Sequence, residues 1–76
     1  MGFDGEIGEY FKRAFLKLVS VQPEAAEAFW LRVVEGKPRT EVTALQGLKR
    51  PETVSERVHR AKKFLRNDLP DFEDFF

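Results

Sequence analysis

The feature that most constrains this chain is a one-sided row of apolar side chains near its C-terminal end. Four of them recur at intervals of four, three and four positions: Val54, Val58, Ala61 and Leu65. This is the spacing of one face of an α-helix. Pro51 suits the first turn of such a helix, and Pro70 is a stop beyond its end. The row therefore predicts a helix over about residues 51–67 with one buried face.

Two earlier segments also have helical spacing. The first helix is predicted over about residues 4–19, with an apolar face made of Ile7, Phe11, Ala14, Phe15, Leu18 and Val19. Pro23 interrupts the chain and suits the first turn of a second helix, which ends at Gly36. The buried stripe of this second helix is predicted to consist of Ala26, Phe29, Trp30, Val33 and Val34.

A short third helix is predicted from Pro38 or Arg39 to Gly47, with Val42 and Leu45 turned inward. Gly47 suits a tight turn between two helices. The pattern predicts an all-α fold, a small four-helix domain with a C-terminal helix-turn-helix. Its core is predicted to contain Phe11, Phe15, Leu18, Phe29, Trp30, Val33, Val42, Leu45, Leu48, Val54, Val58, Ala61 and Leu65.

The length of 76 residues permits a single domain, which the sequence divides into three parts. Residues 1–22 form an N-terminal amphipathic helix and linker, and residues 23–67 contain the helix-turn-helix. Residues 68–76 form an acidic and aromatic tail. Three interpretations of this tail stay open: phenylalanines docked on the core, a docking peptide for a partner, or an arm that screens basic residues.

The charges are unevenly distributed along a chain whose net charge is zero. Residues 1–36 contain four basic and six acidic side chains, and residues 37–67 contain nine basic and three acidic ones. Residues 68–76 contain four acidic side chains and no basic one. A basic central block is typical of a protein that binds a polyanion, but a solvated basic helix face has the same composition. Charge alone leaves both interpretations open.

The chain has no cysteine and a single histidine, which argues against catalysis and against a metal site. Without a nucleophile–base pair or zinc-ligand spacing, the sequence predicts no enzyme, no metal and no cofactor. His59, among arginine and lysine, is expected to be a surface residue or a phosphate contact. The longest apolar runs are too short to cross a bilayer, and residues 1–6 do not have the composition of a signal peptide. We therefore expect a cytoplasmic protein with no membrane partner.

Three motifs together resemble one known family. They are Val34-Glu35-Gly36, then Glu41-Val42 with Gly47 five residues later, and Thr53-Val54…Arg57-Val58-His59-Arg60-Ala61-Lys62-Lys63…Leu65-Arg66. Over about residues 23–66 the chain resembles the C-terminal helix-turn-helix domain, region four, of extracytoplasmic-function sigma factors of the sigma-70 family. Two departures are the Lys37-Pro38-Arg39 segment and one extra residue between Gly47 and Thr53.

The resemblance implies a transcription factor that reads the upstream (minus-35) promoter element of double-stranded DNA in the major groove. It also implies docking on the β flap of RNA polymerase. Base reading would fall to Arg50, Glu52, Thr53, Ser55 and Glu56. Phosphate contacts would fall to Arg39, Thr40, Lys49, Arg60 and Lys63. Arg57, beside the apolar row, would brace the fold through a carboxylate.

Two other hypotheses remain open. The first is a protein–protein regulatory module that uses a sigma-like fold to bind RNA polymerase or an anti-sigma factor. The zero net charge, the outward Glu52 and Glu56, and the acidic-aromatic tail favour it. The second is a fragment of a longer sigma factor. The DNA target sequence and the oligomeric state are not indicated by the sequence.

Overall fold

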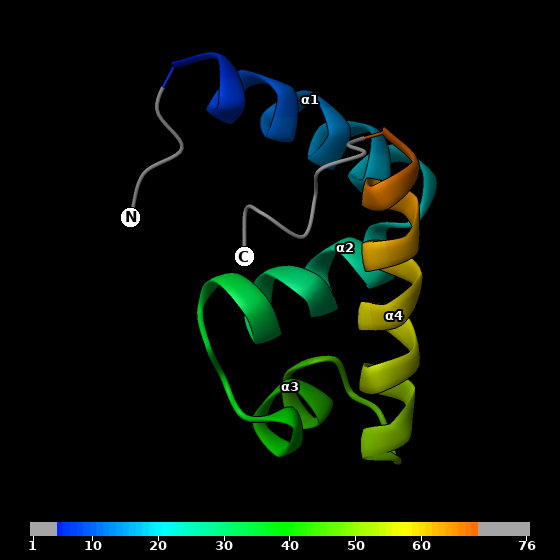
Figure 1. Ribbon diagram of the computed structural model, residues 1–76. Helices are drawn as coiled ribbons and strands as arrows, with labels where there is room; N and C mark the ends of the chain where they lie inside the picture. Colours follow the sequence, from blue (N-terminus) through cyan, green and yellow to red (C-terminus); the bar gives the residue numbers. More distant parts are fainter. Residues whose placement is uncertain (1–4, 69–76) are drawn as a thin grey trace.

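The computed structural model describes the backbone of residues 5–68 and the side chains of residues 9–68. Over that range the chain forms helices joined by short connections, which confirms the all-α fold. The elements are α1 (Gly5–Val21), α2 (Pro23–Phe29), the π-helix η1 (Trp30–Val34), α3 (Arg39–Leu45) and α4 (Pro51–Asp68). In Figure 1, α4 runs along one side of the molecule from α1 to α3, and α2 lies between them.

The break between α1 and α2 lies at Gln22, as Pro23 predicts. The Gln22 N–H donates to the Leu18 carbonyl at 2.7 Å, and the Gln22 carbonyl accepts from Ala26 at 3.0 Å. Pro23 has no N–H to donate, so it fits the first position of α2 without loss of a hydrogen bond. The helix α1 ends at Val21, two residues beyond the predicted end.

The second helix widens into a π-helix before it stops, which the sequence did not predict. The Glu35 N–H donates to the Trp30 carbonyl five residues back, at 3.0 Å. Gly36 then adopts a left-handed conformation with φ of 69°. The Lys37 N–H donates to the Leu31 carbonyl at 2.9 Å and closes the end of the helix. The predicted stop at Gly36 is confirmed.

The connection between α3 and α4 begins with a Schellman motif at Gly47, whose φ is 66°. The Gly47 N–H donates to the Ala44 carbonyl at 3.1 Å, and the Leu48 N–H donates to the Thr43 carbonyl at 2.9 Å. A side chain at position 47 would meet no atom within 4 Å. The glycine is therefore required by the backbone conformation and not by lack of space.

The main core lies where α1, α2 and α4 meet. Its buried members are Phe11, Ala14, Leu18, Ala25, Ala26, Phe29, Ala61 and Leu65. Phe15, Val33, Val34, Val58 and Phe64 pack against them and are partly buried. Four of the buried residues are alanines, and such small side chains allow helices to approach closely. Val42 of α3 and Val54 of α4 are also fully buried, nearer the other end of α4.

Of the predicted core residues, Phe15, Val33, Leu48 and Val58 are half-buried, and two are exposed. Trp30 is 40% exposed and Leu45 is 58% exposed. The buried face of α2 is centred on Phe29 and includes Ala25 and Ala28, so Trp30 lies at its edge. In α3 the buried residues are Val42 and Thr43, which turns Leu45 toward solvent.

The predicted apolar face of α1 also needs correction, because Val19 is 41% exposed. The side chain of Ile7, another predicted member of that face, lies outside the described residues. Phe11, Ala14 and Leu18 are buried as predicted, and Phe15 is half-buried. The predicted face is therefore correct along its centre and wrong at its Val19 edge.

Candidate nucleic-acid interface

The residues predicted to read bases and to bind phosphates belong to α3, to α4 and to the five-residue connection between them. We call this set the α3–α4 surface: Arg39, Thr40, Lys49, Arg50, Glu52, Thr53, Ser55, Glu56, Arg60 and Lys63. All of them are exposed except Thr53, which is half-buried. These side chains are therefore accessible to a partner.

The outward side of α4 lies opposite its buried row. Val54, Ala61 and Leu65 are fully buried, and Val58 is half-buried. The opposite side is solvent-exposed along the helix, at Glu52, Glu56, His59, Arg60 and Lys63. The predicted orientation of this helix is confirmed.

The structure brings one predicted phosphate-binding residue into contact with one predicted base-reading residue. A guanidinium N–H of Arg39 donates to the Ser55 hydroxyl at 3.1 Å, although the residues are 16 positions apart. Arg39 is the first residue of α3, and Ser55 lies in the first part of α4. The start of α3 and the start of α4 therefore contribute to one continuous surface.

Arg50 and Glu52 lie together at the start of α4, with 3.9 Å between Arg50 Nε and Glu52 Oε2. Both side chains are largely exposed, so this ion pair contributes little to stability. Its effect is local, because it places a carboxylate beside the arginine expected to contact a base. Glu52 in the first turn also suits the positive end of the helix dipole.

Lys63 lies apart from these residues. Eleven residue steps of continuous helix separate it from Glu52, which corresponds to about 16 Å along the axis. Arg60 is one turn nearer the start of the helix. The candidate interface is therefore elongated, with the predicted base-reading residues at the start of α4 and Lys63 in its second half.

Arg57 braces the fold, but through a different partner from the one predicted. A guanidinium N–H of Arg57 donates to Gln46 Oε1 at 3.2 Å. The amide Nε2 of Gln46 donates to the Glu27 carboxylate at 3.0 Å and to the Glu24 carbonyl at 3.1 Å. Gln46 therefore links α2 to α4 at the end of α3, and the direct carboxylate contact predicted for Arg57 is replaced by this amide.

Gln46 is not among the site residues predicted from the sequence, although one signal for it is present. Gln46 directly precedes the turn glycine, and it follows the inward-facing Val42 by four residues, which places it on the same side of α3. A polar residue at such a position must find hydrogen-bond partners on the neighbouring helices. The identity of those partners depends on the packing of α2 and α4, which the spacing alone does not determine.

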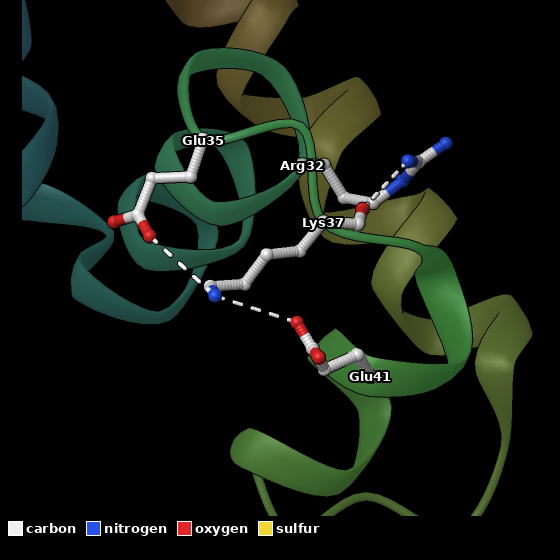
Figure 2. Close-up of polar contacts among 4 residues, drawn as sticks. All are labelled: Arg32, Glu35, Lys37 and Glu41. Carbon is white, nitrogen blue, oxygen red and sulfur yellow. Dashed lines mark hydrogen bonds and ion pairs between the residues drawn. The ribbon is translucent and has the colours of Figure 1, made fainter.

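Lys37 shows that part of the basic block serves the fold. Figure 2 shows its ammonium group between two carboxylates, 3.8 Å from Glu35 Oε1 and 3.4 Å from Glu41 Oε2. The Arg32 guanidinium donates to the Lys37 carbonyl at 2.8 Å on the same connection. These contacts hold the segment between η1 and α3, and they partly neutralise one positive charge of the basic block at residues 37–67.

Thr43, the one buried polar residue among those described, is satisfied within α3. Its hydroxyl donates to the Arg39 carbonyl one turn earlier, at 2.7 Å. Among the side chains of residues 9–68, no group of three or more potential metal ligands occurs. Over the same residues, no helix is both long enough and apolar enough to cross a membrane.

Comparison with known proteins adds no relative to these observations. No protein-family model matches the chain, and no curated protein or solved structure matches it significantly.

Proposed function

We propose that this domain binds double-stranded DNA through the α3–α4 surface, with the first half of α4 in the major groove. The observation that carries the proposal is the orientation of α4, whose apolar row is buried while its opposite, cation-bearing side is exposed. The major groove admits an α-helix, and the N-terminal part of a recognition helix meets the base edges. In this proposal α3 and α4 act as a helix-turn-helix.

Phosphate binding is the first step of this mechanism. Four exposed basic side chains flank the helix start or follow it along α4: Arg39, Lys49, Arg60 and Lys63. Each one that neutralises a phosphate releases condensed counterions, so the affinity falls as salt rises. These contacts set the register of the protein on the duplex without reading its sequence.

Base reading is the second step, and it involves the residues at the start of α4. Arginine recognises guanine through two acceptors, and glutamate accepts from the cytosine amino group. Arg50 and Glu52 are already neighbours, so either one exchanges this partner for a base when DNA binds. Ser55 lies beside Arg39, and its hydroxyl can donate or accept one hydrogen bond with a base. Glu56 repels phosphates and therefore restricts how deeply α4 enters the groove.

The resemblance to region four of sigma factors narrows the proposal further. It favours the upstream promoter element as the DNA target and the β flap of RNA polymerase as a second partner. A protein with that role acts in the cytoplasm of a bacterium, where the promoter is located. The family resemblance covers about residues 23–66, which include all ten residues of the α3–α4 surface.

The experiment that tests DNA binding is fluorescence anisotropy with a generic labelled duplex. We expect non-specific dissociation constants of about 10⁻⁴ to 10⁻⁶ M near physiological salt. If four phosphates are contacted, the affinity should fall about 150-fold between 50 and 200 mM KCl. The logarithm of the binding constant then falls with the logarithm of the salt concentration with a slope of about −3.6. An affinity that does not change with salt contradicts the electrostatic mechanism.

A matched pair of variants tests the location of the interface. Arg60→Ala removes a cation from α4, and Arg13→Ala removes the same side chain from the exposed surface of α1. Arg60→Ala should weaken binding and reduce the salt slope by about one. Arg13→Ala should leave both quantities unchanged. Equal effects of the two variants would mean that the contact does not involve the α3–α4 surface.

The second candidate is a regulatory module that binds RNA polymerase or an anti-sigma factor. The exposed carboxylates of Glu52 and Glu56 on the outward side of α4 favour it, because they repel a phosphate backbone. Absence of duplex binding at high micromolar protein and low salt would favour this candidate. Direct binding to purified bacterial RNA polymerase would then be the deciding measurement.

A further inference from the structure

A groove of about 470 Å³ lies between α1 and the continuous helix formed by α2 and η1, which turns back under α1 after Gln22 (Figure 1). Its lining includes Phe15 and Val19 of α1, and Pro23, Glu27, Trp30 and Leu31 of the facing helix. Leu16 lies within one turn of Val19 on the outer side of α1. We call the groove together with Leu16 the α1–α2 face. None of its residues belongs to the α3–α4 surface.

The α1–α2 face leaves large apolar side chains in solvent. Trp30 is 40% exposed, Val19 is 41% exposed and Leu16 is 58% exposed. The Phe15 and Trp30 rings lie 5.5 Å apart between centroids and form an aromatic wall of the groove. Neighbouring apolar side chains that are exposed together, with polar residues around them, are typical of an interaction site. Aromatic residues such as Trp30 dominate the energetics of such sites.

The two helices that border the groove carry opposite charges. Between residues 9 and 21, α1 has three basic side chains and one acidic one, whereas α2 has two acidic side chains and no basic one. The basic residues of α1 and the acidic residues of α2 are all exposed: Lys12, Arg13, Lys17, Glu24 and Glu27. A partner that complements this face therefore presents an acidic helix and a basic helix on either side of an apolar centre. A second copy of this chain has that arrangement.

Contacts within the chain identify which of these charges we assign to a partner. Lys17 pairs with Asp68 of the same chain, at 3.6 Å between Nζ and Oδ2, so we assign this role on α1 to Lys12 and Arg13. The Glu27 carboxylate accepts one hydrogen bond from Gln46, and a carboxylate has further acceptor positions for a cation. Glu27 also lines the groove, which places one acidic group of α2 at the edge of the apolar centre.

Charge also selects the symmetry of the pair. Two copies can pack face to face about a two-fold axis in two ways. An axis along the helices places α1 of each copy against α2 of the other, whereas an axis across the helices places α1 against α1 and α2 against α2. The first arrangement brings basic side chains opposite acidic ones, and the second brings like charges together. The first arrangement is therefore favoured, and it gives a four-helix interface of two helical hairpins.

We propose that two copies of this chain associate through the α1–α2 face, with α1 of each copy against α2 of the other. The apolar centre of the interface consists of Leu16, Val19 and Trp30 from both copies. At its rim, the basic side chains of α1 pair with the acidic side chains of the partner's α2. The α3–α4 surface lies outside this interface. The inference does not rest on DNA binding, so either proposal can fail while the other stands.

The first test is the dependence of mass and of Trp30 exposure on protein concentration. The face is small, so we expect a reversible dimer that forms between about 1 µM and about 1 mM protein, as measured by sedimentation equilibrium. Trp30 is the single tryptophan, and its acrylamide quenching constant should fall roughly twofold as the dimer forms, because the partner covers the exposed indole. A monomer throughout this range, or a dimer with unchanged Trp30 quenching, overturns the proposal.

A matched pair of leucine variants locates the interface. Leu16 of α1 and Leu45 of α3 are both 58% exposed, so glutamate at either position should leave the domain helical by circular dichroism. Leu16→Glu places a carboxylate in the apolar centre twice per dimer and should weaken dimerisation about 100-fold. Leu45→Glu lies outside the face and should change it by about twofold or less. Equal effects of the two variants would contradict the proposed interface.

Charge reversal tests the pairing of α1 with α2. The variants Lys12→Glu/Arg13→Glu and Glu24→Lys/Glu27→Lys each bring like charges together and should dimerise about tenfold more weakly. An equimolar mixture restores opposite charges on both sides of the axis and should form a heterodimer with roughly the original affinity. If the mixture associates no better than either variant alone, α1 does not face α2 of the partner and the proposal is wrong. The tail predicted at residues 69–76 lies outside the described residues. A Trp30 that is already shielded from acrylamide in the monomer would mean that another part of the same chain covers the face, which also contradicts the proposal.

Discussion

The two ends of α4 are held in different ways. The C-terminal end places Ala61 and Leu65 among apolar side chains of α1 and α2. The N-terminal end also buries Val54, but it is oriented by polar contacts, from Arg39 to Ser55 and from Arg57 to Gln46. This difference indicates that the first end mainly determines stability and that the second mainly determines the geometry of the α3–α4 surface.

The largest effect is expected where the apolar end is disturbed. Leu65→Ala should lower the free energy of unfolding by about 2–5 kcal/mol, because a fully buried side chain leaves a cavity. Leu45→Ala is the matched control, since Leu45 is mostly exposed and its loss should change stability by about 0.5 kcal/mol or less. Urea unfolding followed by circular dichroism measures both. Equal losses would contradict the assignment of Leu65 to the core.

The turn before α4 should give the next largest effect. Gly47→Ala forces a side chain into a left-handed conformation and should cost about 1–2 kcal/mol. Because a Cβ there meets no atom within 4 Å, the cost comes from the backbone alone. Gly47→Asn should cost less, since asparagine tolerates this conformation better. The melting temperatures of the two variants test this order, and a lower value for the asparagine variant would refute it.

A substitution at the N-terminal end of α4, which polar contacts orient, should destabilise the domain less than Leu65→Ala does. It should weaken DNA binding more. Gln46→Ala removes the amide that joins α2 to Arg57 of α4, at a cost of about 1 kcal/mol. The reorientation of α4 should reduce DNA affinity more than Leu65→Ala does when both are measured on folded protein. If Leu65→Ala weakens binding more, the proposed division between the two ends of α4 is wrong.

The smallest effect on stability is expected for the exposed contact between the two helix starts. Ser55→Ala removes a hydroxyl that accepts from Arg39 in solvent, so stability should change by about 0.5 kcal/mol or less. Arg39→Ala should be similarly mild for stability, but it should also reduce the salt slope of DNA binding by about one. Calorimetric melting and anisotropy titrations distinguish these outcomes. A shared loss of several degrees would mean that this contact is structural.

The sequence predicted the helices well because their limits depend on local chemistry. Pro23, Gly36, Gly47 and Pro51 each act on the backbone within a few residues, and each marks a helix end or start. Spacing also identified the buried row of α4, since four positions at helical intervals leave one consistent face. Spacing also predicted that the side of α4 opposite that row is exposed, whereas the residues of the α3–α4 surface came from the family resemblance.

Features that depend on packing between helices were missed. Spacing placed Trp30 and Leu45 in the core, but the tight approach of α2 through its alanines turned the buried face toward Ala25 and Ala28. The π-helical turn at Trp30 and the partners of Gln46 also follow from the positions of neighbouring helices. No periodicity within one segment contains that information.

The most direct test of DNA binding by the α3–α4 surface is an NMR titration of the labelled domain with a short duplex at low salt. If the start of α4 enters the major groove, the largest amide shift changes should occur at residues 39–40 and 49–56, with small changes over α1 and α2. Changes concentrated on α1 or α2, or no change at saturating duplex, would contradict this expectation.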